Sequence, residues 1–291
     1  MLAFLLVMGR VFSSSWSNVV QKQLMAKNLS SLLIVSSNFM LLSVMILPFL
    51  GLISFADMPK AFWWNITIAA LLDIPGNVFL IKSVGKVDLS IFGPLNSYKP
   101  IVALVLGIFL LNEIPSVQGL TGVGIVFLGS FFLAPSGEKL SYKSFYRLMK
   151  APGVGFRFAS LFMTASASIF LKAAINHSSA MHTFTIWAFF GIPISLVSLY
   201  FLNRPDWSEI FGKVKKDFPQ LALLAFLFLA LQMLTLQIFA VMNVAYALSL
   251  FQLSAVVNVF FGHRIFGETN ILQRTIGSLI MAGGAVLLIL T

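Results

Sequence analysis

Two segments of this sequence carry the same pattern of residues at a constant distance. Glu113 recurs as Glu268, 155 residues later, and the same offset relates residues 100–133 to residues 255–288. The shared residues are Gly107, Glu113, Gln118, Gly122, Ile125, Gly129 and Leu133, which recur as Gly262, Glu268, Gln273, Gly277, Ile280, Gly284 and Leu288. A repeated pattern of glycines and apolar residues predicts that the chain folds as two related halves.

The composition indicates that most of the protein surface faces lipid. Hydrophobic residues make up 59% of the 291-residue chain and charged residues only 10%, whereas a soluble domain carries roughly 25% charged residues. So few charges cannot hydrate the surface of a soluble protein. The sequence contains no cysteine, which excludes disulfides and thiolate metal sites.

Apolar stretches of about 20 residues, the length that spans a bilayer, predict ten transmembrane helices and an all-α polytopic membrane protein. They are residues 2–22, 32–54, 62–82, 88–111, 115–134, 153–173, 180–202, 219–240, 243–265 and 271–290. The amphipathic linker 135–150 separates a five-helix repeat, 1–134, from a second one, 151–291. Since five is odd, we expect two inverted repeats. The polar segment 203–219 is expected to lie on the membrane surface, as the linker does.

The basic residues are concentrated in loops on one side of the predicted membrane. These loops follow the odd-numbered spans and hold Lys22, Lys27, Lys82, Lys86, Lys139, Lys143, Arg147, Lys150, Arg204, Lys213, Lys215, Lys216 and Arg264. Lys60 is the clear basic loop residue on the other side. The positive-inside rule explains the net charge of +10 better than nucleic-acid binding does, and it places both termini outside the cytoplasm.

A helix that ends in Gly and Glu, followed by Gln and a glycine-spaced closing helix, occurs twice in this chain. This pattern resembles the drug/metabolite transporter superfamily, and its ten-helix EamA-like branch in particular. The resemblance implies a ten-helix basket whose central cavity opens alternately to each side, with amino acids, metabolites, nucleotide sugars or drugs as substrates. It also implies a structural role for Gly107, Glu113, Gly262 and Glu268. We expect each glutamate to cap the next helix or to bond loop amides, and contact with the substrate is the alternative.

One feature of related small multidrug exporters has no counterpart here. Those proteins use a glutamate in the first helix for proton coupling, whereas the first span of this chain contains no carboxylate. Proton-driven export of cationic drugs by that route is therefore not expected.

The third span carries an acidic residue at its centre, Asp73, followed by Pro75 and Asn77. A charge in hydrocarbon is costly, so such a residue indicates function. Proline kinks a helix and frees carbonyls, which are tolerated only against protein or a wet cavity. We therefore expect Asp73 and Asn77 to line a cavity. The alternatives are an Asp73 that is protonated or bonded to a neighbouring helix, and an Asn77 that only joins helices.

The fourth span contains a lysine at its middle, Lys99, in the sequence GPLNSYKP at residues 93–100. Its two prolines predict a broken helix that exposes Asn96, Tyr98 and Lys99. A lysine this deep needs an anion or water, because it cannot easily reach the surface. Asp73 and a substrate carboxylate or phosphate are the two candidate partners.

The two halves differ at these charged positions. At the offset of 155 residues, Lys99 corresponds to Ser254 and Asp73 corresponds to Phe228. The repeat therefore keeps its glycines and loses its symmetry where an asymmetric substrate would bind.

Further candidate residues lie in the first, sixth and eighth spans. Arg10 is near the middle of the first span and Arg157 lies one turn into the sixth. Guanidinium groups suit carboxylate or phosphate, although Arg157 could instead extend to the headgroups and Arg10 could lie nearer the surface. Gln232 is expected to line the same cavity or to join helices. Trp16 is expected to pack against an apolar part of the substrate.

These residues predict a secondary transporter that moves a small metabolite, such as an amino acid, an amino-acid derivative or an organic anion, by alternating access. The alternatives are a drug or toxic-compound exporter of the same fold, an intramembrane enzyme, and a sensor that has kept the fold. Because the sequence contains no HExxH, glycine-rich phosphate loop or serine-nucleophile motif, we expect no enzyme, no cofactor and no metal. The expected partners are the substrate and the lipid bilayer of a bacterial inner membrane, without nucleic acid, for a monomer or a homodimer.

Overall fold

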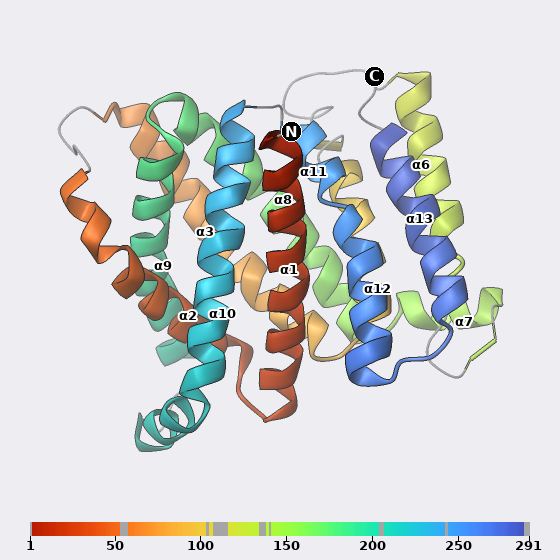
Figure 1. Ribbon diagram of the computed structural model, residues 1–291, viewed down its shortest axis with the longest axis horizontal. Helices are drawn as coiled ribbons and strands as arrows, with labels where there is room; N and C mark the ends of the chain where they lie inside the picture. The colour runs from red at the N-terminus through yellow and green to blue at the C-terminus, as the bar shows by residue number, and fades with distance from the viewer. Residues whose placement is uncertain are drawn as a thin grey trace.

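The computed structural model describes residues 2–52, 58–102, 105–106, 116–133, 138–139, 141–203, 207–241 and 244–287. Within these ranges every regular element is a helix. Figure 1 shows the long helices standing side by side, with the N-terminus and the last helix ending on the same side of the bundle. The all-helical class predicted from the sequence is thereby confirmed.

The first half consists of helices joined by short connections. They are α1 (Leu2–Ala26), α2 (Ser31–Ile46), the 3-10 segment η1 (Leu47–Leu52), α3 (Lys60–Val84), α4 (Leu89–Leu95), the 3-10 segment η2 (Asn96–Tyr98) and α6 (Val117–Ser130). Serine side chains begin two of these helices. Ser30 accepts a hydrogen bond from the Leu33 amide at 3.2 Å, and Ser116 accepts one from the Gly119 amide at 3.0 Å. Each cap satisfies an amide that has no partner within its own helix.

The linker contains the short amphipathic helix α7 (Tyr142–Met149), and the second half follows it. The elements of the second half are α8 (Pro152–Asn176), α9 (Ala180–Asn203), α10 (Trp207–Val241), α11 (Val244–Leu250), α12 (Leu253–Phe266) and α13 (Ile271–Leu287). Residues from Trp207 onward, within the polar segment expected at the membrane surface, are already part of α10. Asp217 is buried there and accepts a hydrogen bond from Lys27 Nζ at 2.6 Å, which ties this segment to α1.

Five helices in the described ranges are long and apolar enough to cross a membrane. They are Lys60–Val84, Pro152–Asn176, Ala180–Phe201, Trp207–Val241 and Ala247–Phe266, and shorter apolar helices cover Ser31–Ile46, Val117–Ser130 and Ile271–Leu287. Large apolar side chains on these helices are exposed, including Trp64 at 70% and Phe226 at 60%. An outer surface of this kind fits lipid rather than water. The protein is a multi-pass integral membrane protein.

Helices of one half pack mainly on helices of the other. The first helix of the first half, α1, packs on α10, the third of the second half, and α8 packs reciprocally on α3. The remaining long helices pair with their counterparts: α2 with α9, α4 with α12, and α6 with α13. Figure 1 shows the last of these pairs side by side at the edge of the bundle. Most contacts between the described helices therefore join the two halves.

The repeated glycines bring the closing helices α6 and α13 into backbone contact. A Cβ on Gly284 would lie 2.9 Å from the Gly122 carbonyl oxygen, and a Cβ on Gly277 would lie 2.9 Å from that of Gly129. Gly122 recurs as Gly277 and Gly129 as Gly284, so the two contacts are reciprocal. The glycines thus serve packing within one chain, since only residues without a side chain allow this approach.

Two helices are interrupted at equivalent places in the middle of the bundle. The segment after α4 becomes a 3-10 turn at Asn96–Tyr98 before the helix resumes at residue 99. In the second half, α11 ends at Leu250 and α12 begins at Leu253. Phe251 corresponds to Asn96 at the offset of 155 residues. The first break was expected from its prolines, whereas the second occurs without a proline at the interruption.

Candidate functional site

A cavity of about 100 Å³ lies between the two halves, where these interrupted helices meet α1, α3, α8 and α10. This volume admits several waters or one small organic molecule. Seven of the nine residues predicted to bind substrate line it: Arg10, Asp73, Asn77, Asn96, Lys99, Arg157 and Gln232. They come from helices far apart in the sequence. The fold therefore brings together residues that the sequence marked one by one.

The acidic group of the cavity is Asp73, on α3. It is 8% exposed, and Asn77 Nδ2, one turn later, donates to its side-chain Oδ2 at 3.1 Å and to its carbonyl oxygen at 2.8 Å. The helix continues through Pro75 without interruption. Asn77 therefore holds the Asp73 side chain against its own helix, on the wall of the cavity.

The break after α4 supplies two further lining residues, Asn96 and Lys99. Asn96 Oδ1 accepts a hydrogen bond from Arg157 Nη2 at 2.9 Å, which joins this break to α8. Lys99 is close enough to Asp73, Arg10 and Arg157 to interact electrostatically with all three. The lysine thus stands among one negative and two positive groups.

Both arginines lie against aromatic rings. The Arg10 guanidinium carbon is 3.7 Å from the centre of the Phe251 ring, and that of Arg157 is 4.0 Å from the centre of the Phe92 ring. Arg10 Nε also donates to Thr235 Oγ1 at 3.4 Å. Arg157 is only 4% exposed, so the alternative in which it extends to the headgroups does not describe this structure.

Donor groups on both arginines remain unused. Arg10 Nη1 and Arg157 Nε are buried and have no hydrogen-bond partner among the described residues. A buried donor without a partner costs free energy. Three cationic side chains and one carboxylate line the described part of the cavity. The site is therefore suited to an acceptor that carries negative charge.

Trp16 and Tyr98 are not among the described residues that line the cavity. The Trp16 ring packs on Phe12 and Phe261, at 6.2 Å and 5.2 Å between ring centres. Tyr98 is 5% exposed and packs on Phe127 and Phe158. Both residues sit on the side of their helix that turns away from the cavity.

Several polar lining residues were not singled out from the sequence. On α1 they are Ser14, Ser17, Asn18 and Gln21, and on the second half they include Thr164, Ser168, Thr235, Gln252, Ser254 and Asn258. Arg10, Ser14, Ser17 and Gln21 follow one another at intervals of three or four residues, which is the period of one helical face, and Asn18 lies next to Ser17. That polar stripe was the available signal for this face of α1.

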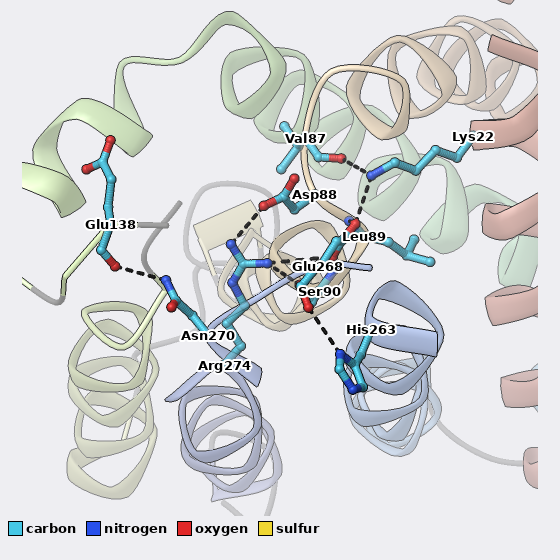
Figure 2. Close-up of polar contacts among 10 residues, drawn as sticks. All are labelled: Lys22, Val87, Asp88, Leu89, Ser90, Glu138, His263, Glu268, Asn270 and Arg274. Carbon is cyan, nitrogen blue, oxygen red and sulfur yellow. Dashed lines mark hydrogen bonds and ion pairs between the residues drawn. The ribbon is translucent and has the colours of Figure 1, made fainter. Parts of the chain in front are cut away.

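A second polar cluster lies beside the cavity, at the start of α4. Glu268, in the loop between α12 and α13, accepts hydrogen bonds from the Leu89 amide at 2.6 Å and the Ser90 amide at 2.8 Å. Figure 2 shows Lys22 reaching the same carboxylate from α1. Lys22 Nζ lies 2.9 Å from Glu268 Oε1 and donates to the Val87 carbonyl, also at 2.9 Å.

Arg274 closes this cluster from the start of α13 (Figure 2). Its side chain is fully buried, forms an ion pair with Asp88 at 2.8 Å and donates to Ser90 Oγ. A Cβ on Gly262 would lie 2.4 Å from Glu268 Oε2 and 3.0 Å from the Ser90 amide. Gly262 therefore gives Glu268 room to bind the amides at the start of α4 in the opposite half, rather than those of the next helix.

The counterparts in the first half, Gly107 and Glu113, lie outside the described residues. Their role therefore remains the expectation drawn from the repeat. Arg274, by contrast, corresponds to Gly119 at the offset of 155 residues, so its contacts with α4 belong to the second half alone. The described ranges also contain no group of three or more residues able to hold a metal ion.

Two comparisons with known proteins concern the sequence of this chain. The model of the EamA-like transporter family matches residues 1–134, in agreement with the resemblance drawn from the repeated motif. The match indicates a membrane transporter of the drug/metabolite type. In a comparison with curated proteins, the sequence has no significant match.

A solved structure, described as "Crystal structure of protein", has a similar fold. It matches with a TM-score of 0.58 and 13% sequence identity, over 98% of this chain and 95% of that one. At this identity the similarity concerns the fold alone.

Proposed function

We propose that this protein is a secondary transporter that carries a small negatively charged metabolite through the cavity between its halves by alternating access. The observation that carries the proposal is the cavity itself, which lies at the centre of an apolar bundle and is lined by Arg10, Lys99, Arg157 and Asp73. Charged groups at such depth are costly unless they serve a bound ligand or ion. Their excess of positive charge favours an organic anion or the carboxylate of an amino acid.

The proposed architecture is a pair of inverted five-helix repeats, with residues 1–134 and 151–291 as the two halves and 135–150 as the linker. The pairing of α1 with α10 and of α8 with α3 supports it, because a twofold axis in the membrane plane exchanges these pairs. The same axis relates each of the other long helices to its own partner. In this arrangement the site lies where the axis crosses the bundle.

Alternating access requires that each side of the cavity can be closed. The cluster of Lys22, Glu268, Arg274 and Asp88 joins the halves at the side where α1 ends and α4 begins, and we propose that it is the closure of that side. By the distribution of basic loops this is the cytoplasmic side, with both termini outside, in a bacterial inner membrane. Rearrangement of the halves about the axis would open that side and close the other.

The proposal is tested by counterflow in proteoliposomes. Purified protein is reconstituted with unlabelled candidate anions inside, and entry of the labelled compound is followed. The wild-type protein should accumulate its substrate transiently, and Lys99→Ala should lose most of this flux. An exposed-site variant, Lys60→Gln, should retain it. Unchanged binding and flux in Lys99→Ala would show that the site is assigned wrongly.

A further inference from the structure

The two arginines of the cavity come from the first helix of each half. Arg10, on the first helix of the first half, lies against Phe251 at the helix break of the second half. Arg157, on the first helix of the second half, lies against Phe92 in α4, the interrupted helix of the first half. Each half thus provides one arginine and one supporting ring for the other.

Each guanidinium group is held firmly but is only partly used. An arginine has five N–H donors in a rigid plane. One edge of Arg10 bonds Thr235 and one edge of Arg157 bonds Asn96, while a ring covers a face of each. Buried N–H groups remain without partners among the described residues on both side chains, at Arg10 Nη1 and Arg157 Nε. Two partly used guanidinium groups therefore come from residues that line one cavity.

These groups lie at different depths of the bundle. Lys22 on α1 reaches the Val87 carbonyl oxygen through its side-chain Nζ, and Gly153 on α8 lies against the Val87 side chain, so the two residues lie at approximately the same level. Arg10 is 12 residues from Lys22, whereas Arg157 is 4 residues from Gly153. At 1.5 Å per residue, the backbones of the two arginines are roughly 12 Å apart along the bundle.

Lys99 and Asp73 determine how much positive charge remains in the cavity for a ligand to neutralise. Lys99 interacts with both arginines and with Asp73. If the charges of Asp73 and Lys99 offset each other, the two arginines remain as two separate positive charges. A ligand with a single anionic group would neutralise one of them and leave the other buried without an anionic partner.

We infer that the site binds a small dianion whose negative charges are on two separate groups, such as a short α,ω-dicarboxylate, with one group at Arg10 and the other at Arg157. This inference rests on the proposed function, since it names the class of substrate for the same cavity. The cavity volume of about 100 Å³ restricts the ligand to a short carbon chain. Lys99 contacts the middle of the ligand or one of its carboxylates.

The test compares ligands that differ by one charge. Binding of malonate, succinate, glutarate and adipate is measured by thermal shift and calorimetry, each against its monomethyl ester. At the preferred length the dianion should bind about tenfold to hundredfold more tightly than the ester, because the ester loses one charged hydrogen-bonded contact. An ester that binds as tightly as its parent, or phosphate that binds as tightly as the best dicarboxylate, overturns the inference.

Variants of each arginine test the two positions separately. Arg10→Gln and Arg157→Gln should each lower dianion affinity to the level of the ester, while ester affinity falls little because the other arginine remains. Lys60→Gln should leave both affinities unchanged. If a glutamine variant does not fold, Arg10→Lys or Arg157→Lys replaces it. Lysine keeps the positive charge but lacks the paired N–H donors of a guanidinium group, so the variant should lose part of the preference for the dianion over the ester. A preference that survives in either folded glutamine variant, or that depends on one arginine only, overturns the inference.

Counterflow separates this inference from the proposed function. If an amino acid or another monoanion shows counterflow and no dianion is preferred, the transporter stands and the dianion site is refuted. If the dianion binds with the predicted arginine dependence but shows no counterflow, the site stands and transport is refuted.

Discussion

The cluster around Glu268 should contribute strongly to stability, and Glu268→Gln tests this. The carboxylate is 4% exposed and accepts hydrogen bonds from Lys22, from the Leu89 and Ser90 amides and from Ser90 Oγ. Arg274 Nη1 lies 3.6 Å away. Removing one partner of a buried ion pair costs about 3–5 kcal/mol. Glutamine keeps one acceptor oxygen, so we expect a loss near the lower end, about 3 kcal/mol.

The loss is measured as a change in the free energy of unfolding in detergent, from denaturant titrations of the wild type and the variant. Glu209→Gln is the matched control, because Glu209 is 63% exposed and pairs with Lys213 one turn away on α10. An exposed pair of this kind contributes about 0.3–0.5 kcal/mol. Lys22→Met should fall between the two, since Glu268 keeps its amide donors. If Glu268→Gln costs no more than Glu209→Gln, the account of this cluster is refuted.

Three further predictions concern the packing and the cavity. Gly129→Val should destabilise the protein by about 1–3 kcal/mol, because a Cβ at residue 129 would lie 2.7 Å from Met281 Cγ. Gly124→Val should change the stability little, because a Cβ at residue 124 would have no atom within 4 Å. Equal free energies of unfolding for the two variants would contradict the α6–α13 contact. Tyr98→Phe should leave substrate affinity within about twofold, because Tyr98 packs away from the cavity, and a large loss in a titration would place it in the site. Asp73→Asn should lower flux in counterflow while the variant still unfolds cooperatively, and unchanged flux would remove Asp73 from the mechanism.

Much of the fold was predictable because its signals are local or repeated. Apolar runs of bilayer length indicate helices without any knowledge of their neighbours. The repeat at 155 residues predicts that α6 and α13 share a role, and the contacts of Gly122 with Gly284 show what the glycines do. Asp73 and Lys99 could be marked individually, since a charge at mid-span is rare whatever surrounds it.

Other features depend on partners distant in the sequence. Arg274 lies near the start of a helix, where the sequence alone suggests an ordinary surface residue. It is buried because it donates hydrogen bonds to Asp88 and Ser90, which lie more than 180 residues earlier. The interruption at Phe251 has no proline to announce it. The same holds for Trp16, whose place on its helix depends on how α1 is rotated in the bundle. Tertiary packing decides these cases, and it leaves no local pattern.

The most direct test of transport through this cavity measures counterflow before and after the cavity is blocked. The chain contains no cysteine, so Ser14→Cys places a single thiol on the cavity wall and Phe12→Cys places one on the exposed apolar face of the same helix. Counterflow is measured before and after complete modification with a bulky thiol reagent, and mass spectrometry verifies the modification. The account predicts that modified Ser14→Cys loses counterflow while modified Phe12→Cys keeps it. Counterflow that continues in fully modified Ser14→Cys would show that the substrate does not pass through this cavity.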